Sequence, residues 1–226
     1  MIKLIKINVL RSYHVTNCYI IWDEKTKEAA IVDPADDAQK IIENIRDLNL
    51  KLKYVMLTHA HKDHTIALNE LLKNYDIKVI ASVDEAPMLE GKVNDCSDVF
   101  GLRQVPFDLS RFILLNDGEC FNIGDINIKI IHTPGHTKGS ACYYIEDEKI
   151  LLTGDTLFSD CFGRCDLDSA SIEDMANSLY NLYKNYNDVH IFPGHNLTNI
   201  NIKDTYPQIK ELLEHVAGVN LDELLK

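Results

Sequence analysis

The stretch Thr58–His64, which reads Thr-His-Ala-His-Lys-Asp-His, constrains this chain more than any other feature. It places three histidines and one aspartate within six consecutive positions. The short apolar run 54–57 precedes it and favours a strand, and apolar residues at helical spacing follow it from 67 to 75. The stretch therefore lies on a turn between a strand and a helix. In α/β proteins, chemistry is placed at the carboxyl ends of strands.

The spacing within this turn predicts metal binding. Imidazole and carboxylate groups together suit zinc, manganese or iron better than calcium or magnesium. His59 and His61 lie two positions apart, so in an extended chain they point the same way and can bind one ion. Asp63 and His64 are adjacent and project differently as the chain turns into a helix. One pair can therefore serve one metal ion and the other pair a second ion.

Composition and charge narrow the class of protein. The 226 residues are 46% hydrophobic and 26% charged, which is ordinary for a globular protein, and we expect one domain over residues 1–226. With 23 basic and 35 acidic side chains the net charge is −12, which disfavours a nucleic-acid or anionic-membrane partner. The start of the chain, 1–10, alternates like a strand and lacks a signal-peptide pattern, and no run is long enough to span a membrane. The six cysteines form no C-x-x-C pair, so we expect reduced thiols and a cytoplasmic location.

Hydrophobic periodicity predicts strands, then helices, then strands, then helices. This order predicts an α/β protein (α+β in some schemes) with two similar halves, each a sheet with its own helices, packed sheet to sheet. Residues 90–111 lose periodicity, and we expect a lid or a pocket wall there. Three strands are expected within 1–33 and one directly before Thr58, and further strands are expected at 77–81, 119–123, 126–132, 140–145, 149–153 and 189–192. Helices are expected at 38–48, from the histidine-rich turn to about 75, at 84–89, after the capping box 171–174, and from Pro207 onward.

Three further polar segments follow predicted strands. They are 133–137, 153–156 and 192–196, and they contain His136, Asp155 and His195 respectively. Each has a glycine beside the candidate ligand, and glycine lets backbone and ligand approach closely. Any one of these segments alone is a weak signal. Together with Thr58–His64 they form a strong joint signal for a metal site.

These motifs resemble the metallo-β-lactamase fold hydrolases, and within them the short glyoxalase II-like (hydroxyacylglutathione hydrolase-like) branch. The resemblance covers nearly the whole chain and implies a four-layer αββα sandwich, with the metals at one edge between the sheets. The segments that carry it are Asn17–Tyr19, Ile31–Pro34, Thr58–His64, Thr133–Ser140, Thr153–Phe158, Gly163–Leu167 and Pro193–His195.

The resemblance also implies a ligand set for two divalent ions, with zinc expected and iron or manganese as alternatives. Two such ions share a water and lower its pKa to about neutrality, and the hydroxide then attacks the carbonyl of a small thioester, ester or lactone. Asp63 is a further candidate for orienting that hydroxide. The implied ligands are His59, His61 and His136 for the first ion, Asp63, His64 and His195 for the second, and Asp155 as a bridge.

Neighbouring residues are candidates for supporting roles. Hydroxyls of Thr58, Thr133 and Thr153, and the carboxylate of Asp33, are candidates for hydrogen-bonding the ligands and fixing their orientation, and the alternative is that they cap the turns in which they stand. Arg164 resembles a family position near the substrate pocket, where a guanidinium would hold a substrate carboxylate.

Two other functions fit the same pattern. One is a persulfide dioxygenase of the same fold, an oxidoreductase that would use one iron held by His59, His136 and Asp155. The other is a domain that stores metal without catalysis. The sequence does not indicate the oligomeric state.

Overall fold

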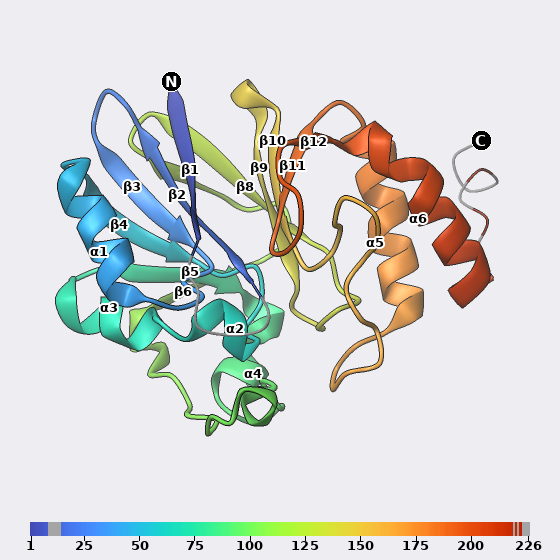
Figure 1. The fold of residues 1–226 in the computed structure, drawn as a ribbon, viewed down its shortest axis with the longest axis horizontal. Helices are drawn as coiled ribbons and strands as arrows, with labels where there is room; N and C mark the ends of the chain where they lie inside the picture. The colour runs from blue at the N-terminus through green and yellow to red at the C-terminus, as the bar shows by residue number, and fades with distance from the viewer. Residues whose placement is uncertain (9–14, 219, 221, 223–226) are drawn as a thin grey trace.

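Two six-stranded mixed sheets lie at the centre of the computed structural model, which describes residues 1–8, 15–218, 220 and 222 (Figure 1). In each sheet the strands follow one another in chain order. The first sheet contains β1 (Ile2–Asn8), β2 (Asn17–Asp23), β3 (Glu28–Val32), β4 (Lys51–Met56), β5 (Lys78–Ser82) and β6 (Phe112–Leu115). The second contains β7 (Cys120–Ile123), β8 (Ile126–His132), β9 (Ala141–Ile145), β10 (Ile150–Gly154), β11 (His190–Pro193) and β12 (Ile200–Asn201).

The pairing directions decide where the strand ends meet. In the first sheet β1, β2 and β3 are antiparallel, and β3 to β6 run parallel. In the second sheet β10 and β11 are parallel, and the other neighbouring pairs are antiparallel. Because β10 and β11 are parallel neighbours, the loops after them lie at the same edge of the second sheet. The loop after β4 joins this edge through a hydrogen bond from the backbone N–H of Ala141, at the start of β9, to the carbonyl of Thr58.

Helices cover the outer face of each sheet. Figure 1 shows α1 and α3 outside the first sheet and α5 and α6 outside the second, which gives the four layers that the sequence predicted. Within the described residues no helix is long and apolar enough to cross a membrane. The helices are α1 (Ala38–Asp47), α2 (Lys62–Thr65), α3 (Leu68–Asn74), α4 (Ala86–Leu89), α5 (Ile172–Asn185) and α6 (Ile202–Ala217), with short 3₁₀ turns at η1 (Val83–Glu85), η2 (Ser97–Phe100), η3 (Leu109–Arg111) and η4 (Glu146–Glu148).

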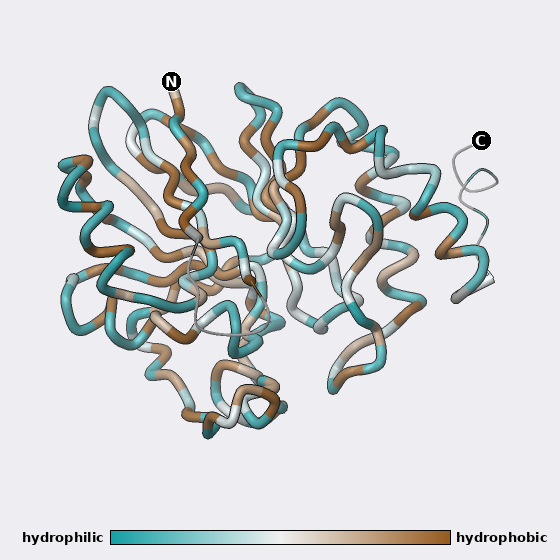
Figure 2. Tube along the Cα trace, viewed as in Figure 1, coloured by the Kyte–Doolittle hydropathy of each residue, from teal (hydrophilic) through white to brown (hydrophobic). Residues whose placement is uncertain are grey.

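Strands β2 and β3 of the first sheet are buried on both faces, and the alternation of their side chains divides the core. In β2 and β3, Ile20 and Ile31 pack toward α1 and α3, while Ile21 and Val32 pack between the two sheets. Such strands read as continuous apolar runs because neither face meets water. The helices, in contrast, alternate between hydrophobic and hydrophilic positions in Figure 2, as expected for elements with one face on the core.

One predicted boundary is wrong. The last helix does not begin at Pro207; α6 begins at Ile202, and Pro207 lies inside it. Asn201 caps the helix, because its side chain accepts a hydrogen bond from the backbone N–H of Lys203 at 3.0 Å. Proline usually stands in the first turn, since it has no N–H to donate. Here the burial of Ile202 and the apolar residues that follow it outweighs the one helical hydrogen bond that proline removes.

The other predicted elements are present, with small differences. The helix expected after the histidine-rich turn is divided into α2 and α3. Residues 90–111 contain two short 3₁₀ turns, η2 and η3. The first strand ends at Asn8, and positions 9 and 10 of the predicted strand lie outside the described residues.

The side-chain hydroxyl of Tyr143 forms a hydrogen bond between the two sheets, and removing it tests how much this contact contributes to the packing. Tyr143 lies in β9, and its buried hydroxyl donates to the carbonyl of Leu57 at 2.8 Å, at the end of β4 in the other sheet. We expect Tyr143→Phe to lower the free energy of unfolding by about 1–2 kcal/mol, because a buried hydrogen bond between the sheets is lost. Urea unfolding measures the change. Tyr144→Phe, in the next position of the same strand, should change stability by less than about 0.5 kcal/mol, and equal losses in the two variants would contradict the assignment.

Candidate metal centre

The candidate ligands come from four connections at the edge where the two sheets meet. His59, His61, Asp63 and His64 follow β4, and the remaining three belong to the second sheet. His136 lies in the β8–β9 turn, Asp155 follows β10, and His195 follows β11. Backbone hydrogen bonds join these connections, from Ala141 N–H to the carbonyl of Thr58 at 2.9 Å and from Gly194 N–H to that of Gly154 at 2.8 Å.

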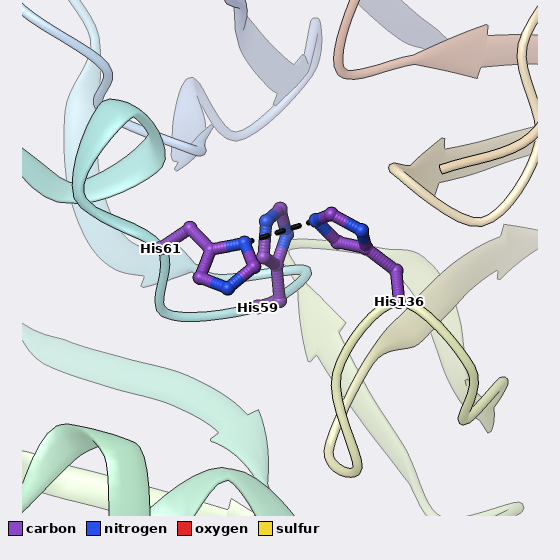
Figure 3. Close-up of side chains that lie close together, drawn as sticks. All are labelled: His59, His61 and His136. Carbon is purple, nitrogen blue, oxygen red and sulfur yellow. Dashed lines mark hydrogen bonds between the residues drawn. The ribbon is translucent and has the colours of Figure 1, made fainter. Parts of the chain in front are cut away.

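Three buried histidines form the first candidate set. One ligand atom each from His59, His61 and His136 can be chosen so that all lie within 4.8 Å of one another. Figure 3 shows the three rings turned toward a common point, with the His61 and His136 rings joined across the gap. The His61 Nδ1 and His136 Nε2 atoms are 2.9 Å apart. This all-imidazole geometry suits a zinc-like ion.

Asp63, His64 and His195 form the second candidate set, again with ligand atoms within 4.8 Å. Asp155 lies between the two sets. Its carboxylate oxygens are 3.3 Å from Nε2 of His64, 3.3 Å from Nε2 of His195 and 3.5 Å from Nε2 of His136. A single carboxylate therefore lies beside imidazoles of both sets.

Several of these atoms are buried without a hydrogen-bond partner. Among the described residues, this is true of Nε2 of His59, His61 and His64, and of Oδ1 of Asp155. A buried polar atom without a partner is costly, and native proteins keep few of them. His59, His64 and Asp155 offer ligand atoms that lie within 4.8 Å of one another, and all are good ligands for a divalent transition metal. The residues present therefore fit a metal centre.

Asp33 orients one imidazole ring of each candidate set. It contacts the His64 ring directly and acts on the His59 ring through Thr58. It accepts hydrogen bonds from the backbone N–H of Thr58 at 2.8 Å and from its hydroxyl at 2.7 Å. Its Oδ2 lies 3.0 Å from Nδ1 of His64, and the Thr58 hydroxyl lies 3.1 Å from Nδ1 of His59. Both rings thereby direct Nε2 toward the centre. The supporting roles predicted for Asp33 and Thr58 agree with these contacts.

The other two threonines have different partners. The hydroxyl of Thr133 pairs with that of Thr156 at 2.7 Å, and that of Thr153 donates to the carbonyl of Leu157 at 2.7 Å. The prediction that Thr133 and Thr153 hydrogen-bond the ligands is therefore wrong. Both hydroxyls instead satisfy buried groups within the turns that carry the ligands.

Backbone carbonyls hold two rings, and sequence reasoning missed them. Nδ1 of His136 lies 2.8 Å from the carbonyl of Arg164, and Nδ1 of His195 lies 3.1 Å from that of Val15. A carbonyl can only accept, so each contact places the proton on Nδ1 and leaves Nε2 free as a ligand atom. Every residue has a carbonyl, so no residue type signals this role.

The two sets differ in charge. Burial lowers the pKa of His61 to about 3 and that of His59 well below its usual value, so both rings stay neutral. Burial also opposes charge on His64 and His195, but neighbouring carboxylates, above all Asp155, outweigh it. They raise the pKa of His195 to about 10 and that of His64 well above its usual range. Without a metal, protons on these two rings neutralise the carboxylates that a cation would otherwise neutralise.

A cavity of about 140 Å³ opens beside the ligands. Part of its wall comes from the 90–111 stretch, through Cys96, Val99 and Phe100. Arg164 also lines the cavity, but its guanidinium forms two hydrogen bonds with the carboxylate of Asp166, at 2.9 and 3.0 Å. The Asp166 carboxylate therefore already balances the charge that a substrate carboxylate would pair with.

Gly194 permits the close approach of two loops at the centre. A Cβ atom at this position would lie 2.3 Å from Oδ1 of Asp155 and 2.7 Å from Cε1 of His64. Any side chain would therefore displace one of these two groups, which explains a glycine immediately before His195.

Comparison with known proteins agrees with this geometry. The family model described as the metallo-beta-lactamase superfamily matches residues 12–202. The chain belongs to the metallo-β-lactamase superfamily. A hydroxyacylglutathione hydrolase, GloC, of Haemophilus influenzae is 32% identical over 180 residues, which are 79% of this chain and 84% of the relative.

A second relative and a solved structure extend the comparison. The probable polyketide biosynthesis zinc-dependent hydrolase PksB of Bacillus subtilis is 30% identical over 207 residues, 91% of this chain and 82% of the relative. The crystal structure of BLEG-1 B3 metallo-beta-lactamase has a TM-score of 0.78 at 29% identity, and covers 90% of this chain and 100% of that one. The predicted membership of the superfamily, with its glyoxalase II-like relatives, is confirmed.

The charge difference between the two histidine sets can be measured on metal-free protein. Because of the shifts given above, ring ¹⁵N NMR after chelation should show His195 doubly protonated from pH 6.5 to 8.5 and His61 neutral down to pH 5. Asp155→Asn removes the main charge that holds the proton on His195 and should lower the pKa of that ring. Titration of both rings near the ordinary value of 6.5 would contradict this electrostatic picture.

Proposed function

We propose that this protein is a binuclear metal-dependent hydrolase that cleaves a small thioester, ester or lactone. The observation that carries the proposal is the position of Asp155, whose carboxylate lies within 3.5 Å of ring nitrogens from both histidine sets and whose Oδ1 has no hydrogen-bond partner among the described residues. A carboxylate so placed would be shared by two cations.

The candidate ligands would bind two separate metal ions. His59, His61 and His136 would hold the first, Asp63, His64 and His195 the second, and Asp155 would bridge them. Two divalent ions at such a site supply an acidified water and stabilise negative charge on a carbonyl oxygen. We propose zinc, which the same donors bind well, with iron or manganese as alternatives. The Bacillus subtilis relative PksB is named as a probable zinc-dependent hydrolase, which supports zinc.

Asp63 would also orient the attacking water. Its side chain lines the cavity, and its Oδ2 accepts a hydrogen bond from the hydroxyl of Thr16 at 3.0 Å. The same atom lies 3.4 Å from Nε2 of His195. The His64 and His195 side chains hold its pKa down, at about 2, against the effect of burial, so it stays an acceptor at neutral pH. A fixed, ionised acceptor can hold a water with one lone pair directed at the substrate.

The cavity favours a compact substrate with an apolar part. Val99, Phe100 and Leu167 line it, and its one guanidinium, on Arg164, is already paired with Asp166. These features support an uncharged acyl group near the ions. The Haemophilus relative is named as a hydroxyacylglutathione hydrolase, and because an acylglutathione is a thioester, this name supports a thioester substrate. A small-molecule substrate, the absence of nucleic-acid and membrane partners, and a cytoplasmic location stay predictions.

Elemental analysis of the purified protein tests the proposal. Because two ligand sets share Asp155, we expect about two ions per chain, with zinc, iron and manganese all counted, and turnover in a panel of thioesters, esters and lactones. One iron per chain, with oxygen uptake on glutathione persulfide and no ester turnover, would contradict the hydrolase and favour the mononuclear dioxygenase. Metal without turnover of any substrate in either assay would favour a storage role.

The bridging role of Asp155 has its own test. Asp155→Ala should remove both ions and lower hydrolysis at least about 100-fold, because each ion loses a ligand and the negative charge that balances it. Asp168→Ala is the matched control, since Asp168 is an exposed carboxylate in a nearby loop. Inductively coupled plasma mass spectrometry counts the ions, and normal metal content in Asp155→Ala would refute the bridge.

A further inference from the structure

Each candidate ligand set combines residues from both sheets. In the first set, His59 and His61 follow β4 of the first sheet, and His136 follows β8 of the second. In the second set, Asp63 and His64 follow β4, and His195 follows β11. The distance between ligands within a set therefore depends on how firmly loops of different sheets are held to one another.

Glu85 joins the two loops of the first set. It ends η1, just after β5 of the first sheet, and only 2% of it is exposed. Its Oε1 accepts from the backbone N–H of Ala60 at 2.7 Å, and its Oε2 accepts from the hydroxyl of Thr137 at 3.0 Å. Ala60 lies between His59 and His61, and Thr137 follows His136. One carboxylate thus fixes the backbone beside all three ligands of the set.

The backbone around Gly139 fits closely against the Glu85 carboxylate. The backbone N–H of Gly139 is a third donor to it. A Cβ atom on Gly139 would lie 2.3 Å from both the backbone nitrogen and Oε2 of Glu85, so only glycine permits this contact. Burial raises the pKa of Glu85 to about 7 while the three donors act to lower it. The partners of this carboxylate are groups of the loops that carry the ligands, so its action is on those loops.

The segment Val15–Asn17 does the same for the second set. The hydroxyl of Thr16 donates to Oδ2 of Asp63 at 3.0 Å, and the carbonyl of Val15 lies 3.1 Å from Nδ1 of His195. The backbone N–H of Asn17 donates to the carbonyl of Gly194 at 2.6 Å.

The Asn17 side chain fastens the same loop of the second sheet. Its amide donates to the carbonyls of Pro193 at 2.9 Å and Asn196 at 3.2 Å, on either side of His195. The segment therefore connects the Asp63 turn of the first sheet to the His195 loop of the second. Its contacts are separate from those of Glu85.

We propose that Glu85 and the Val15–Asn17 segment are independent positioning elements, one for each candidate metal position. Glu85 sets the geometry of His59, His61 and His136, and the segment sets that of Asp63 and His195. Either position can therefore be weakened without the other. This inference rests on the proposed function, because it requires that both sets bind divalent ions.

Single-set backgrounds make the two positions separately measurable. His195→Ala removes a ligand of the second set and leaves the first intact, and His61→Ala does the reverse. In each background the dissociation constant for Zn²⁺ is measured by competition with a chromophoric chelator at pH 8, where Glu85 is ionised. Glu85→Gln and Thr16→Val are then introduced into both backgrounds, so that each change is read on one position at a time.

We expect opposite selectivity from the two substitutions. Glu85→Gln replaces one acceptor by an N–H group facing other donors, and should weaken Zn²⁺ binding 10- to 100-fold in the His195→Ala background but less than about threefold in the His61→Ala background. Thr16→Val should weaken binding about 10-fold in the His61→Ala background alone. Thr16→Ser, which restores the hydroxyl, should recover most of that loss.

Matched controls separate positioning from general stability. Thr26→Val removes another hydroxyl that donates to a carboxylate, that of Asp23 at 3.0 Å, at the opposite end of β2, and should change neither affinity. Circular dichroism establishes that each variant is folded. If Glu85→Gln does not fold, Thr137→Val removes one donor from the same carboxylate and should weaken the first position in the same direction.

The outcomes distinguish this inference from the proposed function. If the parent protein binds two Zn²⁺ ions but Glu85→Gln or Thr16→Val weakens both positions equally, or neither, the independence of the two elements is refuted and the binuclear hydrolase stands. If the parent binds no divalent ion, both proposals fail.

Discussion

The arrangement of this site depends on one buried carboxylate. Asp155 is 8% exposed and lies within 3.5 Å of imidazoles that come from three different loops. A carboxylate removed from water must be neutralised nearby, by protons or by a cation. In the metal-free protein, protons on His64 and His195 do this, and the raised pKa values of both rings are the consequence. Binding divalent ions would release those protons and satisfy the neutral rings as well.

The fold brings these ligands together at one edge of the two sheets. Two sheets packed face to face leave one shared edge, where the loops after β4, β8, β10 and β11 meet. Gly194 and Gly139 allow these loops to approach within distances that a side chain would block. The helices α1, α3, α5 and α6 lie outside the two sheets (Figure 1), and the ligands lie on loops at the edge between the sheets.

Superfamily membership fixes the architecture and the type of centre, whereas the chemistry follows from the site itself. The pairing of Arg164 with Asp166 illustrates the difference. A family position near the substrate pocket is occupied here by a guanidinium, but its charge is already balanced by a neighbour two residues away. The wall of the cavity beside the ligands also has an apolar part, some of which comes from η2.

The sequence by itself indicated the seven candidate ligands and the order of most strands and helices, although it did not predict β12. Both are local properties: each ligand stands directly after an apolar strand, and each element has its own hydrophobic period. The four-layer arrangement followed from that order together with the resemblance to a known family. A local signal also failed at Pro207, where proline suggested a helix start and the packing of the preceding turn decided otherwise.

Only the tertiary structure decided what holds the ligands in place. Glu85 lies 25 residues from Ala60 and 52 from Thr137, and Thr16 lies 47 from Asp63, so no spacing in the sequence links them. The carbonyls of Arg164 and Val15 orient two rings, and a carbonyl is common to all residues, so residue type carries no information about that role. Residue types in the sequence identify the candidate ligands, whereas the orientation of these ligands depends on contacts between chain segments that are far apart in the sequence.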